Sequence, residues 1–242
     1  MVNAPVGFQC PDCAAISNPR GTRTASVQRS GPLAAMPAVS RNIFVACIAI
    51  FLAGKIFGSA NDWVWRFGMW PDGVAQGQWS RLLAATFLHS GILHIAFNMY
   101  ALYVLGPNLE NLLGSRKFFA LYFLSALGGS TAGLWFSDPA STSIGASGAI
   151  FGLLTATIII GRHLRADVSQ LVVLLLINVA LGFSGGIDWR AHLGGAATGA
   201  LIASIYVRDP ALNKSTPHRL GTAAVAIGLI VLIFLRCQQL VS

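Results

Sequence analysis

The chain has 242 residues, of which 55% are hydrophobic, 10% are charged and 26 are glycine, and its mean hydropathy is +0.66. This composition excludes an ordinary soluble domain and indicates a polytopic membrane protein. The net charge of +8 does not indicate nucleic-acid binding, because the basic residues lie in short clusters between apolar runs, as in membrane proteins.

Residues 1–41 are predicted to form a cytoplasmic tail. They hold no apolar stretch long enough for a signal sequence, so we expect the tail to be retained and the first span to direct insertion. Residues 14–40 have the composition of a flexible linker. Cys10 and Cys13 form a C-x-x-C pair, which is half of a tetrahedral zinc site. Either a partner supplies the other ligands, or upstream sequence is absent from this chain, or the pair is vestigial; we expect no metal or other cofactor in this chain.

Apolar runs further along the chain predict an all-α transmembrane bundle. Several runs are shorter than the ~20 residues that cross a bilayer unaided, which predicts local thinning or burial of short helices within the bundle. Between the first two runs, a tryptophan-rich segment at 59–85 is typical of a partly embedded loop. The predicted spans are 43–58, 87–105, 118–136, 147–160, 168–183, 189–206 and 220–235.

The distribution of Lys and Arg predicts the orientation of these spans. If the N-terminus is cytoplasmic, most loop Lys and Arg residues lie on the cytoplasmic side, and the opposite side has only Arg66, Arg81, Arg190 and Arg236. Positive charge accumulates on the cytoplasmic side of membrane proteins. The sequence therefore predicts a cytoplasmic N-terminus and an outer C-terminus.

Strongly polar side chains lie inside three of the predicted spans, where each is costly to bury. The second span carries His89, His94 and Asn98, the fourth begins near Ser147, and the sixth carries His192. His94 and Asn98 are four residues apart and share one helical face. All three spans begin at the outer side, so these residues are predicted to lie at similar depth.

Glycine pairs follow two of these residues. Gly148-x3-Gly152 lies directly after the serine, and Gly195-x3-Gly199 lies one turn after the histidine of the sixth span. Small residues at this spacing let two helix backbones approach closely. We expect this contact to bring the serine hydroxyl within reach of the imidazole.

Each residue alone has a simpler interpretation. A Gly-x-Ser-Gly sequence is more often a packing patch, a single helical histidine is usually a packing residue, and Asn98 fits an interhelical hydrogen bond. Together, a serine, two histidines and an asparagine on faces that begin at one side of the membrane resemble the nucleophile, base and oxyanion donors of an acyl-transfer site.

These motifs resemble those of the rhomboid intramembrane serine proteases, over about residues 42–207. The matching residues are His89-x4-His94-x3-Asn98, Gly145-Ala146-Ser147-Gly148 and Ala191-His192-Leu193-Gly194-Gly195-x3-Gly199. Glu110 and Trp79-x-Arg81 also fit, although Ser80 splits the usual Trp-Arg dipeptide.

The resemblance implies a six-helix protease core at 42–207. Residues 208–242 then form a cytoplasmic loop and a seventh helix, as in the six-plus-one members of the family. Residues 7–13 resemble the end of a zinc-binding extension of some bacterial members, which favours missing upstream sequence as the reason for the cysteine half site.

The resemblance implies a Ser147 and His192 dyad that acts through an acyl-enzyme. Asn98, His94 and the Ser147 backbone N–H would form the oxyanion hole, and each donor would contribute ~2.7 to 4 kcal/mol at the transition state. His89 is structural in the family. Asp188 lies four residues before His192 and could orient its imidazole as a third catalytic member. From its position before the apolar run, we expect it instead to cap the sixth span.

The predicted function is therefore an intramembrane serine endopeptidase in a bacterial plasma membrane. Its partners would be the lipid bilayer and membrane proteins that it cleaves in or near their spanning segments. The alternative is a non-proteolytic rhomboid-like binding protein or chaperone. A transporter is a weaker alternative, because the sequence has no clear internal repeat and no pair of broken helices.

Overall fold

A computed structural model describes two units, divided after Ala35. In the first unit, strands β1 (Val2–Asn3) and β2 (Phe8–Gln9) pair antiparallel. Cys10, Cys13 and most of the predicted linker lie outside the described residues, so the cysteine half site stays a prediction. The described residues are 2–3, 8–9, 31, 33–58, 60–182, 188–208 and 217–242.

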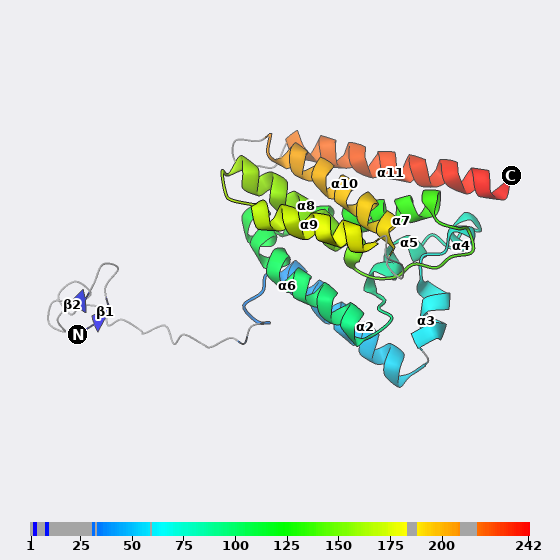
Figure 1. The fold of residues 1–242 in the computed structure, drawn as a ribbon, viewed down its shortest axis with the longest axis horizontal. Helices are drawn as coiled ribbons and strands as arrows, with labels where there is room; N and C mark the ends of the chain where they lie inside the picture. Colours follow the sequence, from blue (N-terminus) through cyan, green and yellow to red (C-terminus); the bar gives the residue numbers. More distant parts are fainter. Residues whose placement is uncertain are drawn as a thin grey trace. The chain divides into compact units, whose positions relative to one another are not determined.

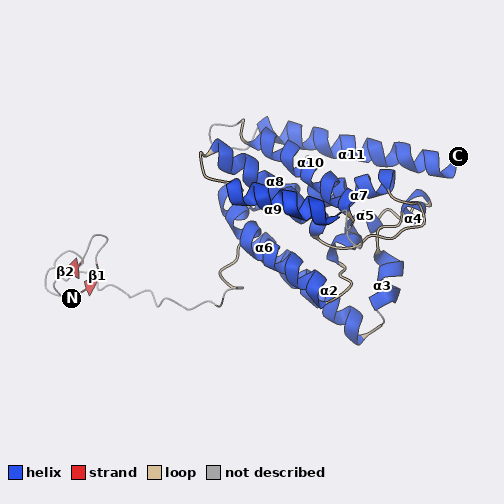
Figure 2. Cartoon of the chain, viewed as in Figure 1, coloured by secondary structure: helices blue, strands red, loops and turns tan. Residues whose placement is uncertain are grey.

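The second unit is a helical bundle, as predicted (Figures 1 and 2). Among the described helices, four are long and apolar enough to cross a membrane: α2, α6, α7 and α11. The apolar helices α8 and α9 are shorter, in line with the short runs in the sequence. The long and short helices are α2 (Ala38–Ile56), α6 (Ile92–Leu113), α7 (Ser115–Phe136), α8 (Ser147–His163), α9 (Ser169–Gly182), α10 (Trp189–Tyr206) and α11 (Pro217–Val241).

Helix α8 lies in the middle of the bundle. Residues 148–156 are all buried, and α7 and α10 pack on this helix and on each other. Helix α11 lies against α7 and α10 (Figure 1). The subdivision of this unit into residues 42–207 and 208–242 stays a prediction.

The second predicted span, 87–105, was wrong at both ends: α6 begins only at Ile92, so His89 lies before the helix. It was expected to stop at Gly106-Pro107, but α6 continues through Pro107 to Leu113. A proline inside a helix costs about 3 kcal/mol. The last turns bury Leu109 and Leu113 at 2% exposure each, and this burial, together with the contacts of Glu110, offsets the cost of the proline.

The tryptophan-rich segment folds into short helices where a loop was expected. These are α3 (Ala60–Phe67), α4 (Pro71–Ala75), α5 (Arg81–Ala84) and the 3-10 turn η1 (Ala85–Phe87). Pro71 suits the first position of α4, since a helix start leaves its N–H without a helical partner. The long-range contacts of one buried arginine hold these pieces together.

Arg81 has this organising role. Its Nη1 donates to the carbonyl oxygens of Trp65 and Gly68, both at 2.9 Å, and its Nε donates to Gln78 Oε1 at 2.6 Å. Its guanidinium lies 5.6 Å from the centre of the Trp70 ring. Arg81 is only 7% exposed. It therefore joins α3, α4 and α5 through one side chain.

Glu110, in the last turn of α6, likewise joins separate segments through one buried side chain. One carboxylate oxygen accepts from Val39 N at 3.0 Å and Ser115 Oγ at 2.7 Å. The other accepts from Ser40 N at 2.7 Å and Ser40 Oγ at 2.6 Å. The carboxylate thus satisfies two backbone N–H groups at the start of α2, which helix geometry leaves without helical partners. It also accepts from the Ser115 hydroxyl at the start of α7.

Replacing Glu110 with glutamine is expected to lower the free energy of unfolding by about 2 kcal/mol, because a hydrogen bond to a charged group contributes about 1.5–3 kcal/mol and an amide has only one acceptor oxygen. Detergent-induced unfolding followed by circular dichroism measures this change. Asp72→Asn is the control: it removes a half-buried carboxylate from the first turn of α4 and should cost about 1 kcal/mol or less. Equal stability of Glu110→Gln and the wild type would contradict the role of Glu110.

Candidate active site

The loop before α8 is held in place by backbone hydrogen bonds. Met69 and Ser143 exchange two bonds of 2.9 Å, and Gly145 N donates to Ala85 O at 2.9 Å. Gly145 has a φ of +124°, a conformation that side chains rarely adopt. Ser147 follows as the first residue of α8 and is half-buried. Its backbone N–H belongs to the first turn, where N–H groups have no helical acceptor.

His94 lies against this turn. A Cβ atom added to Gly145 would lie 2.7 Å from His94 Nε2 and 3.6 Å from Ser147 Oγ. A side chain at this position would displace the imidazole. The structure therefore brings His94 of α6 and Ser147 of α8 to the same point of the chain.

Ser90 orients the His94 ring and was not predicted. Its backbone N–H donates to His94 Nδ1 at 3.4 Å, and its Oγ lies 3.1 Å from the same nitrogen. A backbone N–H can only donate, so Nδ1 is the acceptor and Nε2 of the neutral ring carries the hydrogen. The donor thus lies on the side of Gly145 and Ser147. Ser90 lies before the first residue of α6, so spacing along a helix gave no signal for this contact.

Asn98 shares the His94 face of α6, as predicted. It is 6% exposed, and its Nδ2 donates to His94 O at 2.8 Å. An amide nitrogen carries two hydrogens, so this bond leaves the second one for another acceptor. The bond to the preceding turn also fixes the direction of the side chain.

His192 lies on α10 and stacks on Phe151 of α8. The ring centres are 4.1 Å apart and the planes are tilted by 16°, and His192 is 7% exposed. Phe151 lies one helical turn after Ser147, so it faces the same side of α8. This aromatic contact, which sequence reasoning missed, sets the plane of the imidazole against the residue one helical turn after the serine.

The glycines of α8 and α10 bring the two backbones into direct contact. A Cβ on Gly195 would collide with the carbonyl oxygen of Gly148, and one on Gly199 would collide with that of Gly152. A Cβ on Gly148 would lie 3.3 Å from Ala191 O. The residue that precedes His192 therefore packs on the residue that follows Ser147.

Helix α7 contributes a third backbone to this contact. A Cβ on Gly129 would lie 2.8 Å from Ala191 O and 3.4 Å from Gly148 Cα. Sequence reasoning missed Gly129, although the Gly128-Gly129 pair inside an apolar run was a signal of close packing. The start of α8 is therefore enclosed by α7 and α10 together.

Asp188 caps α10, as predicted. Its Oδ1 accepts from Ala191 N at 3.2 Å. Among the described residues, His192 Nδ1 has no hydrogen-bond partner, and no hydrogen bond joins Ser147 to His192. Catalytic hydrogen bonds often form only once substrate binds. The arrangement is thus a serine and a histidine on packed helices, with Asp188 bonded to its own helix.

A small cavity of about 20 Å³ lies behind the start of α8, and its wall includes Gly145, Gly148 and Ala191. This volume is large enough for one water molecule. The hydroxyl-bearing residues Ser130 and Ser143 also line it. Within the described ranges, no group of three or more His, Cys, Asp or Glu residues is placed to hold a metal ion.

Comparison with known proteins identifies the family of this arrangement. Residues 76–209 match the family model of the rhomboid domain. The chain belongs to the rhomboid family. The matched range includes His94, Asn98, Ser147 and His192, and the resemblance predicted from the sequence is confirmed. As a rhomboid with several apolar helices, the chain is an integral multi-pass membrane protein.

Several curated rhomboid proteins are similar to the chain. Rhomboid protease GluP of Bacillus subtilis is 39% identical over 165 residues, which cover 65% of this chain and 32% of the relative. Rhomboid protease AarA of Providencia stuartii is 30% identical over 183 residues, covering 64% and 63%. RHOMBOID-like protein 2 of Arabidopsis thaliana is 33% identical over 183 residues, covering 68% and 57%. The chain thus spans less than two thirds of the length of each of these relatives.

Proposed function

We propose that this rhomboid is a serine endopeptidase that hydrolyses peptide bonds in or near the membrane-spanning segments of other proteins. The observation that carries the proposal is the backbone contact between α8 and α10, which packs the residues beside Ser147 and His192 against each other. The printed names of the relatives GluP and AarA, both rhomboid proteases, support it.

In the proposed reaction, Ser147 is the nucleophile and His192 is the general base. His192 takes the proton of Ser147 Oγ as the oxygen attacks the scissile carbonyl, and then gives that proton to the leaving amine. A water then attacks the acyl carbon as His192 removes its proton. His192 returns that proton to Ser147 Oγ when the ester bond breaks, which frees the serine and the new carboxyl group. Phe151, stacked on the imidazole, holds the ring while it changes charge.

Three N–H donors would stabilise the oxyanion. They are the backbone N–H of Ser147, Nε2–H of His94 and the second amide hydrogen of Asn98. The start of α8 adds the positive end of the helix dipole. The contact of His94 with Gly145 and the bond from Asn98 to His94 O support this assignment, because donors held in place need no rearrangement as charge develops.

The site is proposed to face the outer side of a bacterial plasma membrane, with the N-terminus in the cytoplasm, as the distribution of Lys and Arg indicates. A substrate helix must unwind to expose a peptide bond. Substrates with small or helix-breaking residues near the cleavage site are therefore favoured, because these residues have low helix propensity.

A serine-directed fluorophosphonate probe and a labelled transmembrane peptide test the proposal on the purified chain in detergent. We expect the probe to modify Ser147, as located by mass spectrometry of the digested protein, and to abolish cleavage of the peptide. Ser141→Ala, a change in the loop before α8, is expected to leave labelling intact. The proposal would be contradicted if the probe modified another residue, or if it labelled Ser147→Ala as strongly as the wild type. A folded chain that is not labelled by the probe and does not cleave the peptide would also contradict it, and would favour a binding protein.

A further inference from the structure

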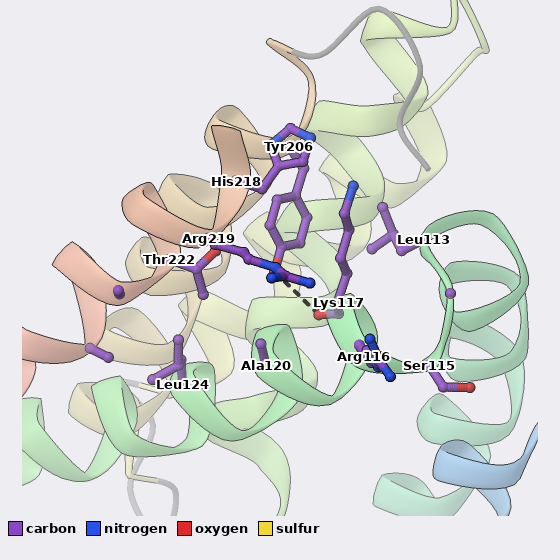
Figure 3. A pocket seen from close by; sticks show the side chains of 13 residues that line it. Leu113, Ser115, Arg116, Lys117, Ala120, Leu124, Tyr206, His218, Arg219 and Thr222 are labelled. Atoms are coloured by element: carbon purple, nitrogen blue, oxygen red, sulfur yellow. Dashed lines mark hydrogen bonds between the residues drawn. The ribbon is translucent and has the colours of Figure 1, made fainter. Parts of the chain in front are cut away.

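A cavity of about 530 Å³ opens between the first turns of α7 and α11, at the end of α10 opposite to His192 (Figure 3). Its inner wall is apolar and its rim is basic. The rim carries Arg116, Lys117 and Arg219. The apolar wall consists of Leu113, Ala120, Leu124, Ala223 and Ala226.

Basic side chains from two helices line this opening. Arg116 and Arg219 are exposed, and Lys117 is half-buried. Lys117 Nζ lies 5.4 Å from the ring centre of Tyr206, whose hydroxyl donates to Lys117 O at 3.3 Å. In Figure 3, the Arg219 side chain extends from α11 toward the first turn of α7. The buried His218 ring packs edge-on against Tyr206, with ring centres 5.4 Å apart, and this packing forms the back of the cavity.

Among the described residues that line the cavity, no acidic side chain balances the charge of Arg116 and Arg219. Both α7 and α11 begin here, and neither has an acidic residue in its first turn. Cations at a helix start act against the helix dipole, whereas an anion is stabilised there. No Asp or Glu is among the described residues that line the cavity. The nearby Glu110 accepts from Val39, Ser40 and Ser115.

We propose that this cavity binds an anionic glycerophospholipid. The phosphate would lie on Arg116 and Arg219, since one guanidinium group can donate two parallel hydrogen bonds to phosphate oxygens. An acyl chain would follow the apolar wall along Leu124, Ala223 and Ala226. Basic pockets between membrane helices suit such headgroups. A free phosphate would leave the apolar wall uncovered, whereas the acyl chain of a lipid from the surrounding bilayer would cover it. The proposal is independent of the protease reaction.

Native mass spectrometry of the detergent-purified full chain, titrated with phosphatidylglycerol or phosphatidylcholine, tests the proposal. We expect one phosphatidylglycerol to bind about tenfold more tightly than phosphatidylcholine, because each cation near an anionic headgroup strengthens binding. R116Q/R219Q is expected to remove this preference, and Arg219→Lys to weaken it. R41Q/R208Q is the matched control: it removes two arginines from the same predicted membrane side but outside the cavity wall, and should keep the preference.

Two further experiments distinguish binding of a lipid from binding of a free anion. Ala223→Trp fills the apolar wall at an exposed position, and is expected to reduce phosphatidylglycerol binding. Inorganic phosphate is expected neither to displace phosphatidylglycerol nor to raise the melting temperature. Circular dichroism checks that each variant is folded. The proposal would be overturned if both R116Q/R219Q and Arg219→Lys kept the lipid preference of the wild type. It would also be overturned if R41Q/R208Q lost the preference equally, or if inorganic phosphate displaced the lipid.

Discussion

Ser147→Ala and His192→Ala are each expected to lower kcat/KM for a transmembrane peptide by about 10⁴-fold or more, and the double variant is expected to lose no more than either single variant. Nucleophile and base act as one unit, so removing the second group after the first costs little. The residual rate would come from the oxyanion donors and from substrate binding. Single-turnover cleavage in detergent, with each variant at the same concentration, measures the three values.

Two control variants make this prediction specific to the proposed dyad. His163→Ala removes an exposed histidine at the end of α8 and is expected to leave kcat/KM unchanged. Asp188→Asn is expected to cost less than about tenfold, because a helix cap contributes only about 0.5–2 kcal/mol and the cap is partly retained by asparagine. If Asp188→Asn lost as much activity as Ser147→Ala, the site would be a triad. If the loss of kcat/KM in the double variant equalled the product of the two single losses, Ser147 and His192 would act independently and not in one shared step.

Gly195→Ala is expected to lower the free energy of unfolding by about 3 kcal/mol, the upper part of the range for overpacking. The added methyl group would collide with the Gly148 carbonyl oxygen, and a backbone atom cannot turn aside as a side chain can. Since α8 and α10 would have to separate, we also expect fluorophosphonate labelling of Ser147 to fall. Unfolding in detergent, followed by circular dichroism, measures the stability.

Gly228→Ala is the matched control for this substitution. A Cβ added to Gly228 of α11 meets no atom within 4 Å. Alanine is favoured over glycine inside a helix by roughly 0.5–1 kcal/mol, so this variant is expected to be at least as stable as the wild type. If Gly195→Ala and Gly228→Ala had the same stability, the close contact of α8 and α10 would not hold the bundle together.

The glycine contact explains why packing and proposed chemistry coincide in this protein. In lipid, helices gain little from burying apolar groups against each other, so close backbone packing is a main source of association. The same packing aligns the start of α8 with the start of α10. Phe151 then stacks on His192 as a consequence of the contact one turn away. A change that loosens the packing is therefore expected to affect the site as well.

The sequence by itself determined the features that depend on composition and short spacing. The apolar runs predicted a membrane helix bundle, because helices satisfy their own backbone hydrogen bonds in lipid. Spacing of four residues placed His94 and Asn98 on one face and paired the glycines of α8 and α10. The helix cap at Asp188 could also be predicted, since capping is a local interaction.

Only the tertiary structure decided the features that join distant segments. Glu110 bonds to residues 70 and 71 positions earlier, Arg81 joins three short helices, and the His192 ring stacks on Phe151 of another helix. Local propensity was misleading at Pro107, where burial and long-range hydrogen bonds outweighed the tendency of proline to end a helix. These contacts depend on which helix faces which, and residue spacing within one helix does not carry that information.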